Sequence, residues 1–261
     1  MRIFLKYIKL VMAGLTGSLI AAASNGAEYL PGPNGRISYV LQLPRGFDQA
    51  RDKCPLVIVM HGVMSNKDVP PMPRIARKLV QKGFAVLRFD FNAQGKSEGD
   101  ILKCTIPSEI ADARAVYEFA RSLPFVTSVV LLGHSQGGAV AGMLAGELAR
   151  GTAEMLAGEP TGEMKKEPAG TLAGSPTGET KEEPAGALAE RISAPDALVL
   201  LAPGAVLKDY ALEGKFLGVE CDPVDPPEYV QVYWYKFSRD YIKTAQTLPI
   251  YEVSALYQGP V

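Results

Sequence analysis

One stretch, residues 129–138, limits what this chain can fold into more than any other. It begins with Val129–Leu132, four aliphatic residues that are typical of a buried strand. From Gln136 onward small residues open a helix. The turn between the two elements has the sequence G-x-S-x-G, with Ser135 at its centre. We therefore expect a strand, a very tight turn and a helix, with no room for a side chain at Gly133 or Gly137.

Ser135 is the candidate nucleophile. A tight turn forces this residue into a strained backbone conformation and lifts its hydroxyl clear of the sheet. The free N–H groups of the following helix then lie beneath that hydroxyl. The alternative is a turn rich in glycine and serine that has no chemical role. The strand–turn–helix context favours the nucleophile.

Strands and helices alternate along the rest of the chain, as is typical of α/β proteins. Buried strands are expected at residues 55–60, 84–89, 129–132 and 197–201, an outer antiparallel strand at 37–43, and helices at 74–82 and 107–123. This alternation predicts a mostly parallel sheet that is covered by helices on both faces. The chain has 261 residues, a length that α/β proteins commonly fold as one domain.

Charge and composition exclude several classes of function. The formal net charge is −1 and no basic patch stands out, so nucleic acid is not expected as a partner. Cys54, Cys104 and Cys221 are odd in number and widely spaced, which fits neither a disulfide framework nor a metal site. We expect no metal and no cofactor.

Residues 1–27 have the pattern of a signal peptide. Arg2, Lys6 and Lys9 give a positively charged start, an apolar segment runs from Leu10 to Ala23, and small residues after it offer cleavage sites. The apolar segment is short for a membrane span. We expect export to a bacterial periplasm or secretion, with no stable membrane insertion after cleavage. An uncleaved membrane anchor is the alternative.

The region 151–190 differs in composition from the rest of the chain. It contains a tandem repeat, residues 156–171 and 172–187, that is rich in Gly, Pro, Glu and Lys and nearly free of core-forming residues. Such a segment buries too little apolar surface to offset the entropy lost when it becomes ordered. We expect a disordered and dispensable insertion in a surface loop. A tail that binds a partner is the alternative.

Residues 206–247 show no buried strand pattern and carry a dense group of aromatic side chains. These are Tyr229, Tyr233, Trp234, Tyr235, Phe237 and Tyr241. They could pack together under a flap. They could equally line a site for a flat phenolic acid, stacking on its ring and bonding its hydroxyl.

Six motifs stand in a fixed order along the chain. They occupy residues 61–63, 88–92, 95–99, 133–138, 200–204 and 248–255. In this order they resemble the α/β-hydrolases, and in particular the bacterial cinnamoyl (feruloyl) esterases. The resemblance implies an α/β-hydrolase fold with a core at 28–150 and 191–205, an inserted lid at 206–247 and a return to the core at 248–261. It also implies a serine esterase that acts through an acyl-enzyme on small hydroxycinnamoyl esters, such as those of plant cell walls.

Two backbone N–H groups are expected to form the oxyanion hole in such an enzyme. One belongs to Val63, because the glycine before it lets the loop approach the substrate oxygen, and the other belongs to Gln136, directly after the nucleophile. The alternative is that His61-Gly62 merely ends a strand.

The resemblance also implies substrate contacts in the lid. Tyr241 falls where a lid tyrosine contacts the phenolic hydroxyl in the family, and simple packing is the alternative. Asp209 or Tyr210 lies near an acidic lid contact.

A catalytic base is missing from the pattern. The sequence has two histidines, His61 in the expected oxyanion loop and His134 beside the nucleophile, and neither position suits a base for Ser135. The family's Asp and His follow the strand that would begin at Gly259, so we expect a C-terminally truncated chain with negligible esterase activity. Two alternatives stay open: another serine hydrolase, such as a lipase-like esterase or an aminopeptidase, and a non-catalytic binding protein.

Overall fold

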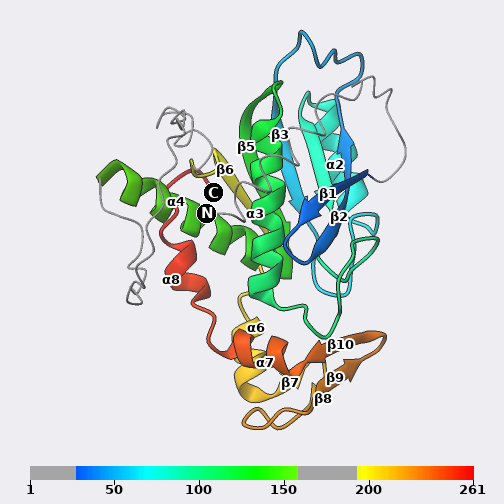
Figure 1. Cartoon of the computed structure of the whole chain (residues 1–261), viewed down its shortest axis with the longest axis vertical. Helices are drawn as coiled ribbons and strands as arrows, with labels where there is room; N and C mark the ends of the chain where they lie inside the picture. Colours follow the sequence, from blue (N-terminus) through cyan, green and yellow to red (C-terminus); the bar gives the residue numbers. More distant parts are fainter. Residues whose placement is uncertain (1–27, 158–192) are drawn as a thin grey trace, which may run out of the picture.

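A computed structural model describes residues 28–157 and 193–261, which are coloured in Figure 1. The main sheet in these residues has six strands in the order β1-β2-β4-β3-β5-β6. The strands are β1 (Glu28–Gly32), β2 (Gly35–Gln42), β3 (Cys54–Met60), β4 (Ala85–Phe89), β5 (Val126–His134) and β6 (Ala197–Leu201). Strands β4, β3, β5 and β6 pair in parallel, whereas β1 and β2 are antiparallel to their neighbours. The predicted mostly parallel sheet is confirmed.

Helices cover both faces of the sheet, as the sequence predicts. On one face, α2 (Met72–Gln81) places Met72 and Ala76 against Val57 and Val86. On the other face, α3 (Ile106–Ser122) and α4 (Gln136–Ala157) pack on the alternate side chains of the same strands. Figure 1 shows α3 and α4 in front of the sheet, and α2 contacts β3 and β4.

Three glycines of helix α4, Gly138, Gly142 and Gly146, stand four residues apart, and each lies against another segment. A Cβ on Gly138 would be 3.0 Å from the Cα of Pro203, and one on Gly142 would be 2.8 Å from the Oγ of Ser254. A Cβ on Gly146 would overlap the carbonyl group of Val253. The short helix α8 (Ile250–Ser254) therefore rests directly on the backbone of α4. This contact returns the chain from the lid to the core, as the red segment of Figure 1 shows.

Three expectations need correction or lie outside the described residues. The turn signals of residues 31–35 conceal β1, which forms a hairpin with β2. Helix α4 continues to Ala157, past the boundary expected at residue 150, because its sequence stays rich in good helix formers. The expected signal peptide and the tandem repeat fall almost entirely outside the described residues.

The segment 206–247, called the lid below, lies at one end of the sheet (Figure 1, bottom). It contains α6 (Leu207–Glu213), β7 (Lys215–Phe216), β8 (Val219–Glu220), β9 (Tyr229–Val232), β10 (Tyr235–Ser238) and α7 (Arg239–Gln246). The sequence shows no buried strand pattern here, yet β7–β8 and β9–β10 form two antiparallel hairpins. Strands of two to four residues are too short to produce a clear alternating pattern.

Side chains of three lid elements form an aromatic cluster inside it. The ring centroid of Phe237 lies 5.2 Å from that of Phe216 and 5.0 Å from that of Tyr241. All three side chains are buried.

Within residues 28–157 and 193–261, no helix is long and apolar enough to cross a membrane. Nor do His, Cys, Asp and Glu residues in those ranges form a group of three or more that could hold a metal ion.

Candidate active site

Ser135 sits at the point where β5 turns into α4, in a left-handed backbone conformation with φ of 54°. This conformation is unfavourable for a residue with a Cβ and persists only where surrounding contacts fix it. The N–H of Ser135 donates to the carbonyl of Leu201 at 2.9 Å. Its own carbonyl accepts from Gly138 at 2.8 Å and from Gly204 at 2.7 Å. The turn is therefore held by backbone bonds from α4 and from the loop after β6.

The two glycines of the G-x-S-x-G turn are required by the space around them. A Cβ on Gly133 would overlap the carbonyl oxygen of Gly137. A Cβ on Gly137 would overlap the carbonyl oxygen of His61, at the end of β3. The collisions expected from the sequence are present, and they involve backbone atoms that cannot move aside.

The loop after β3 passes next to the nucleophile. A Cβ built on Gly62 would lie 3.0 Å from the Cβ of Ser135, so a glycine allows this approach. Among the described residues, neither the N–H of Val63 nor the N–H of Gln136 donates to an acceptor. The structure thus brings two free backbone donors, one from each flanking segment, to the neighbourhood of Ser135.

His61 supports this loop and is not free to act as a base. Its Nε2 accepts a hydrogen bond from the N–H of Phe91 at 3.2 Å, so Nδ1 carries the proton and donates to the carbonyl of Gly62 at 2.8 Å. The ring is buried, and burial lowers the pKa of His61. In the part of the chain that the structure describes, neither His61 nor His134 is hydrogen-bonded to the Ser135 hydroxyl.

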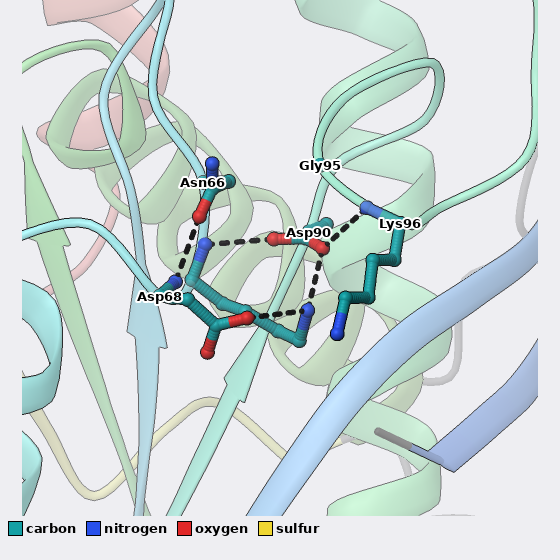
Figure 2. Close-up of a pocket in the computed structure, with 6 residues that line it drawn as sticks. Asn66, Asp68, Asp90, Gly95 and Lys96 are labelled. Carbon is teal, nitrogen blue, oxygen red and sulfur yellow. Dashed lines mark hydrogen bonds and ion pairs between the residues drawn. The ribbon is translucent and has the colours of Figure 1, made fainter. Parts of the chain in front are cut away.

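A buried ion pair anchors the same loop to the end of β4 (Figure 2). The Nζ of Lys67 lies 2.8 Å from Oδ2 of Asp90, and its backbone N–H donates to Oδ1 at 2.7 Å. The N–H of Lys96 donates to Oδ2 as well, at 2.8 Å. Both charged side chains are fully buried beside a cavity of about 300 Å³ that Asn66 and Asp68 also line. Because the two charges neutralise each other, this pair fixes the loop rather than offering a charge to a ligand.

Gln136 joins the nucleophile helix to the lid and to α3. The hydroxyl of Tyr241 donates to Oε1 of Gln136 at 2.7 Å. Nε2 of Gln136 donates in turn to Oε2 of Glu109 at 2.6 Å, and Nε2 of Gln94 donates to Oε1 of Glu109 at 2.7 Å. Glu109 is fully buried, and this burial raises its pKa to about 8.

The two lid residues expected to contact the substrate, Tyr241 and Asp209, differ in burial and in hydrogen bonding. Tyr241 is 1% exposed, its ring lies in the aromatic cluster and its hydroxyl is used by Gln136. Burial raises the pKa of Tyr241 well above its ordinary value. Asp209 lies in the first turn of α6, is exposed to solvent and makes no hydrogen bond within the described ranges. Contacts therefore connect Tyr241, but not Asp209, to the residue after the nucleophile.

Three residues of this site do not follow from sequence reasoning. Lys67 and Asp90 are far apart in the chain, and the position of Asp90 at the end of a buried strand is the only signal for their pair. Glu109 looks like an ordinary acidic residue in the first turn of a helix. Its apolar neighbours on the same helix give no indication that it faces Gln136.

The sheet order, the helices on both faces and the strained serine turn after β5 define the α/β-hydrolase fold with a nucleophile turn of the kind serine hydrolases use. Residues 51–163 match the family model described as serine aminopeptidase, S33. The fold resembles that of Est1E from Butyrivibrio proteoclasticus, solved with ferulic acid bound, with a TM-score of 0.68 and 24% identity over 90% of this chain and 76% of that one. A second Est1E structure gives a TM-score of 0.66 and 23% identity, covering 91% and 76% of the two chains.

A shorter similarity links the chain to a human protein. Protein ABHD12B of Homo sapiens is 33% identical over 91 residues. The match covers 35% of this chain and 24% of that protein, so the chain aligns with about a quarter of its length. These comparisons confirm the predicted α/β-hydrolase fold and its resemblance to the Est1E structures.

Proposed function

We propose that this protein is a serine hydrolase that cleaves carboxylic esters through an acyl-enzyme. The observation that carries the proposal is Ser135, held at φ of 54° with two unused backbone N–H groups, those of Val63 and Gln136, beside it. A strained serine flanked by free donors is the arrangement that acyl transfer needs.

The reaction follows from these positions. The Ser135 oxygen attacks the ester carbonyl carbon and gives its proton to a base, while the carbonyl oxygen becomes negatively charged. The N–H groups of Val63 and Gln136 stabilise that charge, and removal of one such donor costs about 10²–10³ in kcat in a comparable enzyme. The bond to the alcohol then breaks, the alcohol takes up a proton, and water hydrolyses the acyl-enzyme.

Hydroxycinnamoyl esters are the proposed substrate class. The support is the group of aromatic side chains in the lid and the fold shared with Est1E, whose structure was solved with ferulic acid. The matched family model favours a second candidate, an aminopeptidase that uses the same serine. The two differ in whether the acyl group is a planar phenolic acid or an aminoacyl group.

The described residues supply no base for this serine, and both histidines of the sequence are among them. Without a base the Ser135 hydroxyl keeps its proton at neutral pH, and attack is slow. We therefore expect turnover close to background from this chain, at most the roughly 10³–10⁴-fold acceleration over water that a disabled triad enzyme can retain.

The test compares the full chain with Ser135→Ala on methyl ferulate, p-nitrophenyl acetate and an aminoacyl p-nitroanilide, with and without added imidazole as an external base. We expect slow hydrolysis of the two esters that imidazole accelerates only when Ser135 is present. Ester hydrolysis that Ser135→Ala leaves unchanged would overturn the proposal. Cleavage of the anilide in preference to both esters would establish the aminopeptidase. Fast turnover without imidazole that Ser135→Ala abolishes would show that His61 or His134 acts as the base.

Export is proposed on the pattern of residues 1–27 alone. We expect removal of the N-terminus near Ala23 or Ala27 when the chain is expressed in a bacterium. Mass spectrometry of periplasmic material gives the result directly, and an intact Met1 there would exclude cleavage.

A further inference from the structure

The side chain of Gln136, the first residue of α4, is hydrogen-bonded to the lid on one side and to α3 on the other. On one side its Oε1 accepts from Tyr241 of α7. On the other side its Nε2 donates to Glu109 of α3. Glu109, Gln136 and Tyr241 are each no more than 1% exposed. Three elements that are far apart in the sequence thus meet in one water-excluded chain of hydrogen bonds.

The direction of these bonds is set by Glu109. Its two carboxyl oxygens accept hydrogen bonds from the amide groups of Gln94 and Gln136. The NH₂ group of Gln136 must therefore face Glu109, which turns its oxygen toward the lid. Tyr241 then meets an acceptor and donates its hydroxyl proton to it.

We infer that Glu109 is a positioning residue that latches the lid to the nucleophile helix through the amide of Gln136. The residue that receives the lid tyrosine also supplies one of the two N–H groups assigned to the oxyanion. The catalytic consequence of the latch rests on the proposed function. The latch itself rests only on the contacts.

The surroundings of Glu109 argue against a role in packing alone. Burial of a carboxylate is unfavourable unless a cation compensates it. In the described part of the chain no Lys or Arg is paired with Glu109, and the titratable groups that face it are Asp112, Cys104, Tyr235 and Tyr241. The two carboxyl oxygens of Glu109 each accept from a buried amide, and one of these bonds orients Gln136.

Hydrogen exchange of the lid tests the latch without any need for turnover. Exchange of the α7 and β10 amides is measured by mass spectrometry in the wild type, Glu109→Gln, Tyr241→Phe and the double variant. Loss of a bond to a buried partner shifts a local opening equilibrium by about tenfold. We expect each single variant to accelerate lid exchange by about that factor. In the Tyr241→Phe background, Glu109→Gln should add less than about twofold, because both changes break the same chain of bonds.

Tyr257→Phe is the matched control. Its hydroxyl is also buried against a protein acceptor, the carbonyl of Pro195 at 3.0 Å, but lies outside this chain of bonds. The control should leave lid exchange unchanged and should combine additively with Glu109→Gln.

Two results would overturn the latch. One is additive acceleration in the Glu109→Gln/Tyr241→Phe double variant, as expected if Glu109 acts only on general stability. The other is unchanged lid exchange in Tyr241→Phe, and this single variant keeps the test decisive if Glu109→Gln fails to fold. Neither result depends on catalysis by Ser135. The exchange experiment can therefore contradict the latch without contradicting the proposed hydrolase activity, and the reverse is also true.

Discussion

The nucleophile turn and the lid are held in opposite ways. At the turn, backbone meets backbone, and a Cβ on either glycine would overlap a carbonyl oxygen. In the lid, the aromatic cluster is made by side chains, and a Cβ on Gly218, between β7 and β8, would have nothing within 4 Å. Tyr233 and Trp234, between β9 and β10, are 77% and 75% exposed. The turn therefore depends on close backbone contacts, whereas the lid core depends on side chains and the tips of its hairpins lie in open space.

The largest expected effect comes from filling the space at the turn. Gly137→Ala forces either β3 or α4 to move, and we expect a loss of more than about 4 kcal/mol of stability or no folded protein. Gly218→Ala is the matched change in the lid. It adds the same methyl group at φ of 89° into open space and should cost only about 1–2 kcal/mol for the left-handed backbone. Urea unfolding of both variants measures the difference, and equal losses would contradict the contrast between the two regions.

The same contrast explains which parts the sequence predicts. The sequence motif of the turn lies within five residues, so Gly133, Ser135 and Gly137 predict it directly. The contact between Gln136 and Tyr241 joins residues that are 105 positions apart, and no local pattern specifies it. The lid hairpins are hidden for a related reason, since Phe216 and Phe237 are buried against each other rather than against a long strand. A single sequence can predict a structure that depends on neighbouring residues, but it does not predict which distant side chains will pair.

The next effect separates a buried ion pair near the turn from an exposed one in the lid. Lys67→Met leaves Asp90 buried without its cation and should destabilise the protein by about 3–5 kcal/mol. Arg239→Met removes a partner of Asp225 in the lid, where the side chains are 49% and 77% exposed, and should change stability by less than about 1 kcal/mol. Urea midpoints at constant slope provide the comparison. A loss in Arg239→Met as large as that in Lys67→Met would show that the lid is as rigidly held as the sheet.

A smaller and pH-dependent effect is expected where the two regions meet. Glu109 has a pKa of about 8 when folded, above its ordinary value of 4.5, because it is buried. Between these two values the folded protein retains a proton that the unfolded chain has released. The stabilisation from this group is thus complete below about pH 4.5 and is lost as the pH rises to about 8.

Glu109→Gln cannot titrate, so it isolates this contribution. The stability of the wild type minus that of Glu109→Gln should fall between about pH 4.5 and pH 8 and be constant on either side. Each unit of pKa difference corresponds to about 1.4 kcal/mol, so the change should amount to a few kcal/mol at most. Asp112 is present in both proteins and cancels to first order. A difference that rises with pH would show that Glu109 gains rather than loses stability by ionising.

The smallest effect concerns strain that both regions store. Ser135 at φ of 54° and Tyr233 at φ of 51° have the same left-handed conformation, one in the turn and one at the tip of the lid. A Cβ in this conformation costs roughly 1–2 kcal/mol, and glycine removes that cost.

The Ser135 hydroxyl makes no hydrogen bond within the described residues, so its removal forfeits no contact there. We expect Ser135→Gly to be about 1 kcal/mol more stable than Ser135→Ala, which keeps the Cβ and lacks the hydroxyl. Tyr233→Gly should gain less than Ser135→Gly, since an exposed hairpin tip can relax part of its strain whereas the closely packed turn cannot. Thermal unfolding of the three variants decides the order, and a Ser135→Ala protein as stable as Ser135→Gly would mean that the turn stores no strain at its nucleophile.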